Sequence, residues 1–68
     1  MTTIFEDAPK VDGIRGDYAR VTAIEDRVLI RAIDEMAEEA VTIAMTPEQA
    51  RALAAAIVDA ASDAEASA

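Results

Sequence analysis

The sequence predicts an α+β domain in which a three-stranded antiparallel sheet is packed by one C-terminal helix, a βββα arrangement. Three short stretches rich in large apolar, mostly β-branched residues predict the strands: residues 18–24, 28–33 and 41–45. An alanine-rich segment with helical periodicity follows from Pro47. We therefore expect an irregular arm at residues 1–17, a single domain at residues 18–61 and a frayed acidic tail at residues 62–68.

The arm is predicted to lack regular structure because Pro9, Gly13 and Gly16 interrupt any helical or strand period in it. Two interpretations of its apolar pair, Ile4 and Phe5, stay open. These side chains either anchor the arm to the domain or form a docking hook that becomes ordered when a partner binds.

Residues 18–33 are predicted to form the first two strands, joined by a turn at Glu25, Asp26 and Arg27. The density of Val and Ile is highest at residues 28–33 and a polar cluster follows, which favours a strand that ends in a turn. The alternative is an amphipathic helix over residues 27–39 with Asp26 as its N-cap, because apolar residues in this range also recur at helical spacing. Neither Gly nor Asn occurs in the polar cluster that would form the turn after residue 33, so the helical alternative stays open.

The third strand and the start of the helix have the clearest local signals. Residues 41–45 alternate large apolar residues with Thr and Ala, so one face of this strand is apolar. Thr46 is a suitable N-cap, and Pro47 occupies the first helical position, where its missing N–H group has no cost. Gln49 is placed to bond back to the Thr46 amide and complete a capping box.

The helix is expected from Pro47 to about Ala61, with one apolar stripe that closes the sheet. This stripe consists of Ala50, Leu53, Ala54, Ile57, Val58 and Ala61. Residues 62–68 contain no large apolar side chain, so this segment should fray.

Between Asp26 and Ala61 the chain contains Arg-Val-Leu-Ile-Arg, then Val-Thr-Ile-Ala-Met-Thr-Pro-Glu-Gln-Ala-Arg, then the alanine-rich helix. In this half it resembles small uncharacterised proteins of actinobacteria and their phages, which end in a similar pattern of strand, Thr-Pro-Glu-Gln-Ala-Arg and helix. The resemblance implies a small sheet-plus-helix fold and brings no catalytic residues to transfer.

The composition indicates a small core. The chain has 68 residues and contains neither cysteine nor histidine, which excludes disulfides and any zinc site built on those ligands. Much of its 53% hydrophobic content is alanine, and a core of this kind supplies no more than about 3–5 kcal/mol. Self-association or a partner surface is therefore expected.

The formal net charge of −8 is concentrated in the second half of the chain. Residues 34–68 hold eight acidic groups and one basic group, Arg51. Such a surface repels phosphates, so direct binding of nucleic acid or of an anionic membrane is not expected. The expected partner is a protein with a basic or apolar patch, or a second copy of the chain.

The N-terminus lacks the basic start and apolar run of a signal peptide, and no segment approaches the ~20 apolar residues that span a bilayer. We therefore expect a cytoplasmic protein, located in the host cytoplasm if a phage encodes it.

The densest acidic cluster consists of Asp34, Glu35, Glu38 and Glu39. In a helix, these residues would be neighbours four positions apart and could hold a hard cation through their oxygens. The glycine and the alternating ligands of a calcium loop are missing, which favours a solvated turn or helix face. We predict no metal and no cofactor.

Residues for nucleophilic catalysis are scarce. The only serines, Ser62 and Ser67, lie in the predicted tail, and Lys10 is the only lysine. Gly13 and Gly16 do not precede the strand–loop–helix unit of a phosphate-binding loop. We therefore predict a protein without enzymatic activity.

Two further groups of residues have alternative roles. Arg27 and Arg31 either pair with acids across the sheet or contact an acidic partner. Ala52, Ala55 and Ala56, together with Asp59, lie opposite or beside the apolar stripe and form either a plain helix surface or a smooth face for close contact with another helix.

We expect the chain to be a non-enzymatic acidic protein-interaction module that binds or modulates a host or phage protein. The module itself is encoded either by a bacterium or by a phage. One alternative is a structural or assembly component, such as a small virion protein or a homo-oligomer. The other is a nucleic-acid mimic that inhibits a DNA- or RNA-binding protein. The candidate partner-binding residues are Asp34, Glu35, Glu38, Glu39, Ala52, Ala55, Ala56, Ile4 and Phe5.

Overall fold

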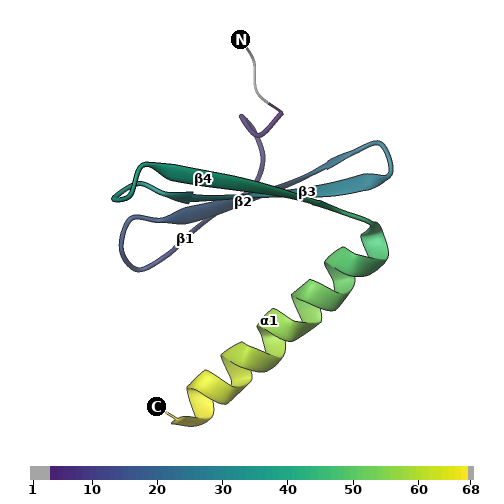
Figure 1. Cartoon of the computed structure of the whole chain (residues 1–68). Helices are drawn as coiled ribbons and strands as arrows, with labels where there is room; N and C mark the ends of the chain where they lie inside the picture. The colour runs from purple at the N-terminus through teal and green to yellow at the C-terminus, as the bar shows by residue number, and fades with distance from the viewer. Residues whose placement is uncertain (1–3, 68) are drawn as a thin grey trace.

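The computed structural model describes residues 4–67, which form one antiparallel sheet followed by one long helix (Figure 1). Residues 1–3 of the predicted arm and Ala68 of the predicted tail lie outside the described residues. The strands lie side by side in chain order and precede the helix: β1 (Lys10–Asp12), β2 (Tyr18–Ile24), β3 (Arg27–Asp34), β4 (Glu39–Met45) and α1 (Pro47–Ser67). The predicted α+β class, antiparallel sheet and C-terminal helix are confirmed.

The sheet has four strands, so the prediction of three strands is wrong. The additional strand, β1, lies within the segment predicted to be an irregular arm and places Lys10 opposite Arg20. A strand of three residues is too short to show an alternating pattern of apolar and polar side chains. Gly13, which suggested disorder in the sequence, instead ends the strand and donates its N–H to the Asp17 carbonyl at 2.7 Å.

The helical alternative for residues 27–39 is wrong. Residues 27–34 form β3, which pairs with β2 on one side and β4 on the other, with Ile30 opposite both Val21 and Ile43. A central strand gains hydrogen bonds and apolar neighbours along both edges, and this pairing outweighs the helical spacing of the same residues.

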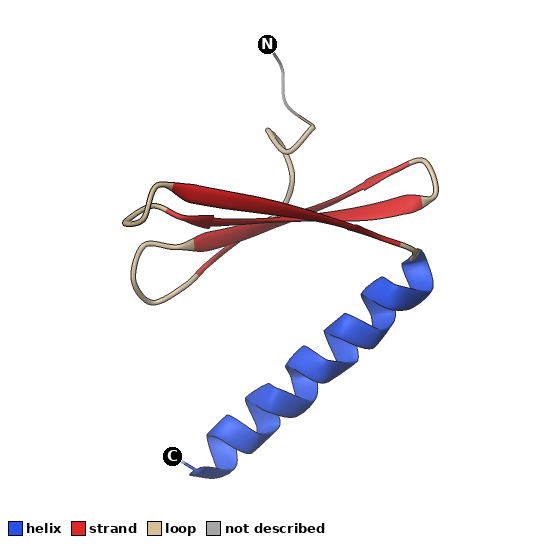
Figure 2. Ribbon diagram, in the orientation of Figure 1, coloured by secondary structure: helices blue, strands red, loops and turns tan. Residues whose placement is uncertain are grey.

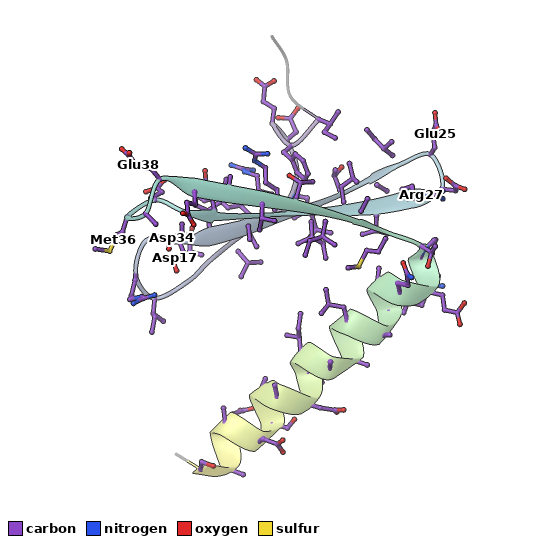
Figure 3. The ribbon with its side chains drawn as sticks, in the orientation of Figure 1. Asp17, Glu25, Arg27, Asp34, Met36 and Glu38 are labelled. Carbon is purple, nitrogen blue, oxygen red and sulfur yellow. The ribbon has the colours of Figure 1, made fainter. Side chains whose placement is uncertain are left out.

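Both long hairpins contain a residue with positive φ that is not glycine. Glu25 has φ 54° in the two-residue turn between β2 and β3, and Glu38 has φ 55° at the end of the turn between β3 and β4. Figure 3 shows these residues at opposite ends of the sheet. Within the second turn, Asp34 Oδ1 accepts the Ala37 N–H at 3.2 Å and the Glu35 carbonyl accepts the Glu38 N–H at 3.3 Å.

The predicted capping box is confirmed at the start of α1. The Thr46 hydroxyl accepts the Gln49 N–H at 3.1 Å, and the Gln49 side-chain carbonyl accepts the Thr46 N–H at 3.0 Å. The helix continues to Ser67 instead of fraying after Ala61. Residues 62–67 include two alanines, the strongest helix former, and the Ser67 hydroxyl donates to the Asp63 carbonyl at 3.2 Å.

The two faces of the sheet are covered by different parts of the chain (Figure 2). Residues 4–9 lie over one face, here called the arm face, and α1 lies on the other side, here called the helix face. Directly paired residues share a face, so the register assigns every strand residue. The arm face consists of Lys10, Asp12, Tyr18, Arg20, Thr22, Ile24, Arg27, Leu29, Arg31, Ile33, Ala40, Thr42 and Ala44. The helix face consists of Val11, Ala19, Val21, Ala23, Val28, Ile30, Ala32, Asp34, Glu39, Val41, Ile43 and Met45.

The expectation that the helix stripe closes the sheet is wrong beyond the first turns of α1. Ala50 and Leu53 are half-buried, whereas Ile57 is 59% and Val58 is 63% exposed, and none of the described helix residues is buried. Figure 1 shows that α1 starts at the edge of the sheet and moves away from it toward the C-terminus. Because Thr46 is the single residue between β4 and α1 and is held by the capping box, this junction sets the direction of the helix.

Replacement of Thr46 by alanine should lower the free energy of unfolding by about 1 kcal/mol, because two helix-terminal hydrogen bonds lose their partner or their geometry. Urea denaturation followed by circular dichroism measures this change. Thr46→Ser keeps the hydroxyl and should retain most of the stability. An equal loss in both variants would show that the hydroxyl does not cap the helix.

Replacement of Glu25 or Glu38 by glycine should raise the free energy of unfolding by about 0.5–1 kcal/mol, because a left-handed backbone costs an L-residue about 1–2 kcal/mol and costs glycine less. Glu35→Gly is the matched control, since Glu35 lies in the second turn and has no positive φ. Thermal unfolding of the three variants tests the comparison. Stabilisation by Glu35→Gly alone would contradict it.

Candidate protein-interaction surface

The helix face of the sheet is apolar from β1 to β4. Successive rows place Val11, Ala19, Ala32 and Val41 side by side, then Val21, Ile30 and Ile43. Charged residues of this face occur only at its end, where Asp34 pairs with Glu39. Four of its large side chains remain more than two-fifths exposed: Val11, Val21, Val41 and Ile43.

The stripe of α1 faces the same open space. Residues four apart lie one above the other on a helix, so Ile57 projects from the same side of α1 as the half-buried Leu53. Among the described strands, α1 contacts β3 and β4. We call the helix face and this stripe together the apolar wedge, since the two surfaces meet at Thr46 and separate toward the end of the helix (Figure 1).

The open end of the wedge contains a hollow of about 430 Å³ that is lined by the ends of all four strands. Its apolar lining includes Val11, Ala19, Ala32 and Val41 of the helix face, and its acidic lining residues are Asp12, Asp17, Asp34 and Glu39. Figure 3 shows Asp17 and Asp34 near one another at this end of the sheet, opposite the end that carries Glu25 and Arg27. The hollow is thus an apolar floor with an acidic rim.

The predicted acidic cluster lies at the turn between β3 and β4, with Asp34 and Glu39 at the strand ends and Glu35 and Glu38 within the turn. It is therefore not a helical array with neighbours four apart. Asp34 uses one oxygen to accept the Ala37 N–H, and the three glutamates are exposed. Among residues 4–67, no group of three or more acidic side chains is placed to hold a metal ion.

The predicted alanine surface and the predicted hook occupy different places. Ala52, Ala55 and Ala56 are exposed and lie on the side of α1 opposite the centre of the apolar stripe, by the 100° rotation per residue of a helix. Ile4 is half-exposed, but Phe5 is 7% exposed and lines a small hollow on the arm face. Phe5 is therefore covered by the chain itself and occupies the place of an anchor.

The arm face carries a row of cations that the sequence analysis missed. Lys10, Arg20 and Arg31 lie side by side on three strands, and Lys10 Nζ lies 4.4 Å from the centre of the Tyr18 ring. Arg20 donates to the Ala8 carbonyl at 2.7 Å, which ties the arm to the sheet. The row depends on β1, so it becomes visible in the sequence only after that strand and its register are recognised.

The arginines predicted to form cross-sheet ion pairs have other partners. Arg27 contacts the adjacent Asp26 carboxylate at 3.0 Å, and Arg31 donates to the Thr42 hydroxyl at 3.2 Å. Both contacts are exposed to solvent and contribute little to stability.

Comparison with protein-family models, with curated proteins and with solved structures finds no match to this chain. Within residues 4–67, no helix is both long and apolar enough to cross a membrane. The candidate site therefore rests on its own geometry: an uncharged apolar wedge, with charges confined to its rim and to the other surfaces.

Replacement of Phe5 by alanine should lower the free energy of unfolding by about 3 kcal/mol, because it removes the largest buried side chain among the described residues. Ile4→Ala, at the half-exposed neighbour, should cost less than about 1 kcal/mol and serves as the control. Denaturant unfolding distinguishes the two interpretations of the arm. A Phe5→Ala variant as stable as the wild type would favour the docking hook.

Proposed function

We propose that this chain is a non-enzymatic protein-interaction module that acts through its apolar wedge. The observation that supports the proposal is the exposure of large apolar side chains on two surfaces that face each other, the helix face of the sheet and the stripe of α1. Soluble monomers rarely expose a contiguous apolar patch of more than a few hundred Å², and larger patches commonly mark contacts with protein or membrane.

The distribution of charge supports a protein contact at the wedge. Glu48, Asp59 and Asp63 lie on the side of α1 opposite the centre of the apolar stripe, and the acidic cluster lies at a turn. These charges keep a chain of net charge −8 soluble while the wedge itself stays free of charge. The acidic character also disfavours an anionic membrane as the occupant of the wedge.

The resemblance to proteins of actinobacteria and their phages suggests a host or phage protein as the target. A structural or assembly role is the second candidate. The specific observation that favours it is that one chain carries both an apolar sheet face and an apolar helix stripe, so copies of the chain offer complementary elements to one another.

Replacement of Ile57 by lysine should abolish salt-resistant protein binding, because it places a charge in the wedge. The measurement is a pull-down with the tagged chain from an actinobacterial lysate supplemented with untagged chain, washed at low and at high salt. Ala55→Lys adds the same charge on the opposite, exposed side of α1 and should bind like the wild type.

Unchanged capture by Ile57→Lys would refute the wedge as the contact surface. Release of a nucleic-acid-binding protein at high salt, with equal capture by both lysine variants, would instead support mimicry of nucleic acid.

A further inference from the structure

We infer that the occupant of the wedge is a second copy of this chain, with the stripe of α1 from each copy packed on the helix face of the other. The inference rests on the proposed function, because it uses the same surface, and it names the partner. Three observations support it: the surface area of the chain, its dimensions, and the fit between the helix face of the sheet and the stripe of α1.

The chain exposes more surface than a compact monomer of its mass. Its accessible surface is 5495 Å², whereas a compact monomer of 7.2 kDa has about 4,100 Å². A stable interface buries about 800 Å² on each partner. The excess of roughly 1,400 Å² is therefore sufficient for a dimer contact of ordinary size.

The dimensions lead to the same conclusion. The radius of gyration is 13.4 Å, whereas a compact chain of 68 residues has about 11 Å and a compact body of twice that length about 14 Å. A second chain placed in the wedge would thus double the mass with little increase in the radius of gyration.

The two apolar elements are compatible in length and chemistry. Residues 57–67 of α1, which lie beyond the contacts with the chain's own sheet, span about 16 Å, and the eight residues of β3 span about 26 Å, so this part of the helix from one copy fits within the length of the sheet of the other. In a two-fold dimer the contact of helix on sheet occurs twice, since each copy supplies one of each. Ile57 and Val58 from one copy would then lie against Val41 and Ile43 from the other.

The charge of the chain predicts how this association responds to salt. Each copy carries −8, and the acidic rim at Asp34 and Glu39 is brought toward a second acidic chain. Salt screens this repulsion and leaves apolar contact intact, so the dimer should tighten as salt is added. A basic protein partner would show the opposite dependence.

The experiment is sedimentation equilibrium of the full chain over a concentration series that reaches high micromolar, at low and at high salt. We expect a dimer with a mass of twice 7.2 kDa, which dissociates less at high salt than at low salt. Ile57→Lys and Val41→Lys should sediment as monomers, whereas Ala55→Lys should remain dimeric. Circular dichroism checks that each variant keeps its fold.

Disulfide trapping provides a second measurement that does not depend on a destabilising variant, because the chain has no cysteine of its own. A mixture of Val41→Cys and Ile57→Cys chains should form a mixed disulfide-linked dimer under oxidation. A mixture of Val41→Cys and Ala55→Cys chains should not, since Ala55 lies on the other side of α1.

A folded wild-type chain that stays monomeric at every concentration and salt would overturn the inference. If the chain is monomeric but the wild type captures a protein from the lysate that Ile57→Lys does not capture, the proposed function would stand with a different partner. A dimer that forms equally well with lysine at Ile57 and Val41 would also overturn the inference, because the contact would then lie outside the wedge.

Discussion

The junction at Thr46 is the constraint on which the rest of the structure depends. One residue separates the last strand from the helix, and the capping box holds both its amide and its hydroxyl. The helix consequently leaves the sheet in a fixed direction, which keeps Leu53 near β3 and β4 and carries Ile57 and Val58 away from them. The open wedge is thus the result of a well-satisfied local motif.

The two faces of the sheet illustrate how little apolar material a chain of this length has for a core. On the arm face, Phe5 and Ala8 become the only buried residues among those described, and Arg20 holds the Ala8 carbonyl in place. The helix face has the larger apolar area but receives only the first turns of α1. The arm covers part of the face that carries the cations, and most of the face without them is left open.

Sequence reasoning succeeded where the determining interactions are local. The capping box involves residues three apart, and the alternation of Val41, Ile43 and Met45 on one face follows from strand geometry alone. Both features were predicted and are present. The prediction of a strand at residues 28–33 is confirmed for a similar reason, since the density of Val and Ile exceeds what a surface helix carries, although β3 also includes Arg27, predicted to lie in the turn, and Asp34.

The features that were missed depend on distant parts of the chain. β1 forms because Lys10, Val11 and Asp12 pair with β2. Three residues are too few to show the alternating pattern by which a strand is predicted from sequence. The row of Lys10, Arg20 and Arg31 follows from that pairing. The failure of the helix stripe to close the sheet is a matter of the angle at Thr46, which no pattern of residue types encodes.

The separation of α1 from the sheet has a consequence for how the molecule unfolds. Beyond Leu53, most of the hydrogen bonds of α1 are local to the helix, and an isolated helix of about three turns is marginal in water. In a single chain, residues 57–67 therefore form a separate unit of low stability whose amides exchange with solvent far faster than those of β3. Occupation of the wedge would join this unit to the sheet, so that cooperativity of unfolding becomes a property of the assembly and rises with protein concentration.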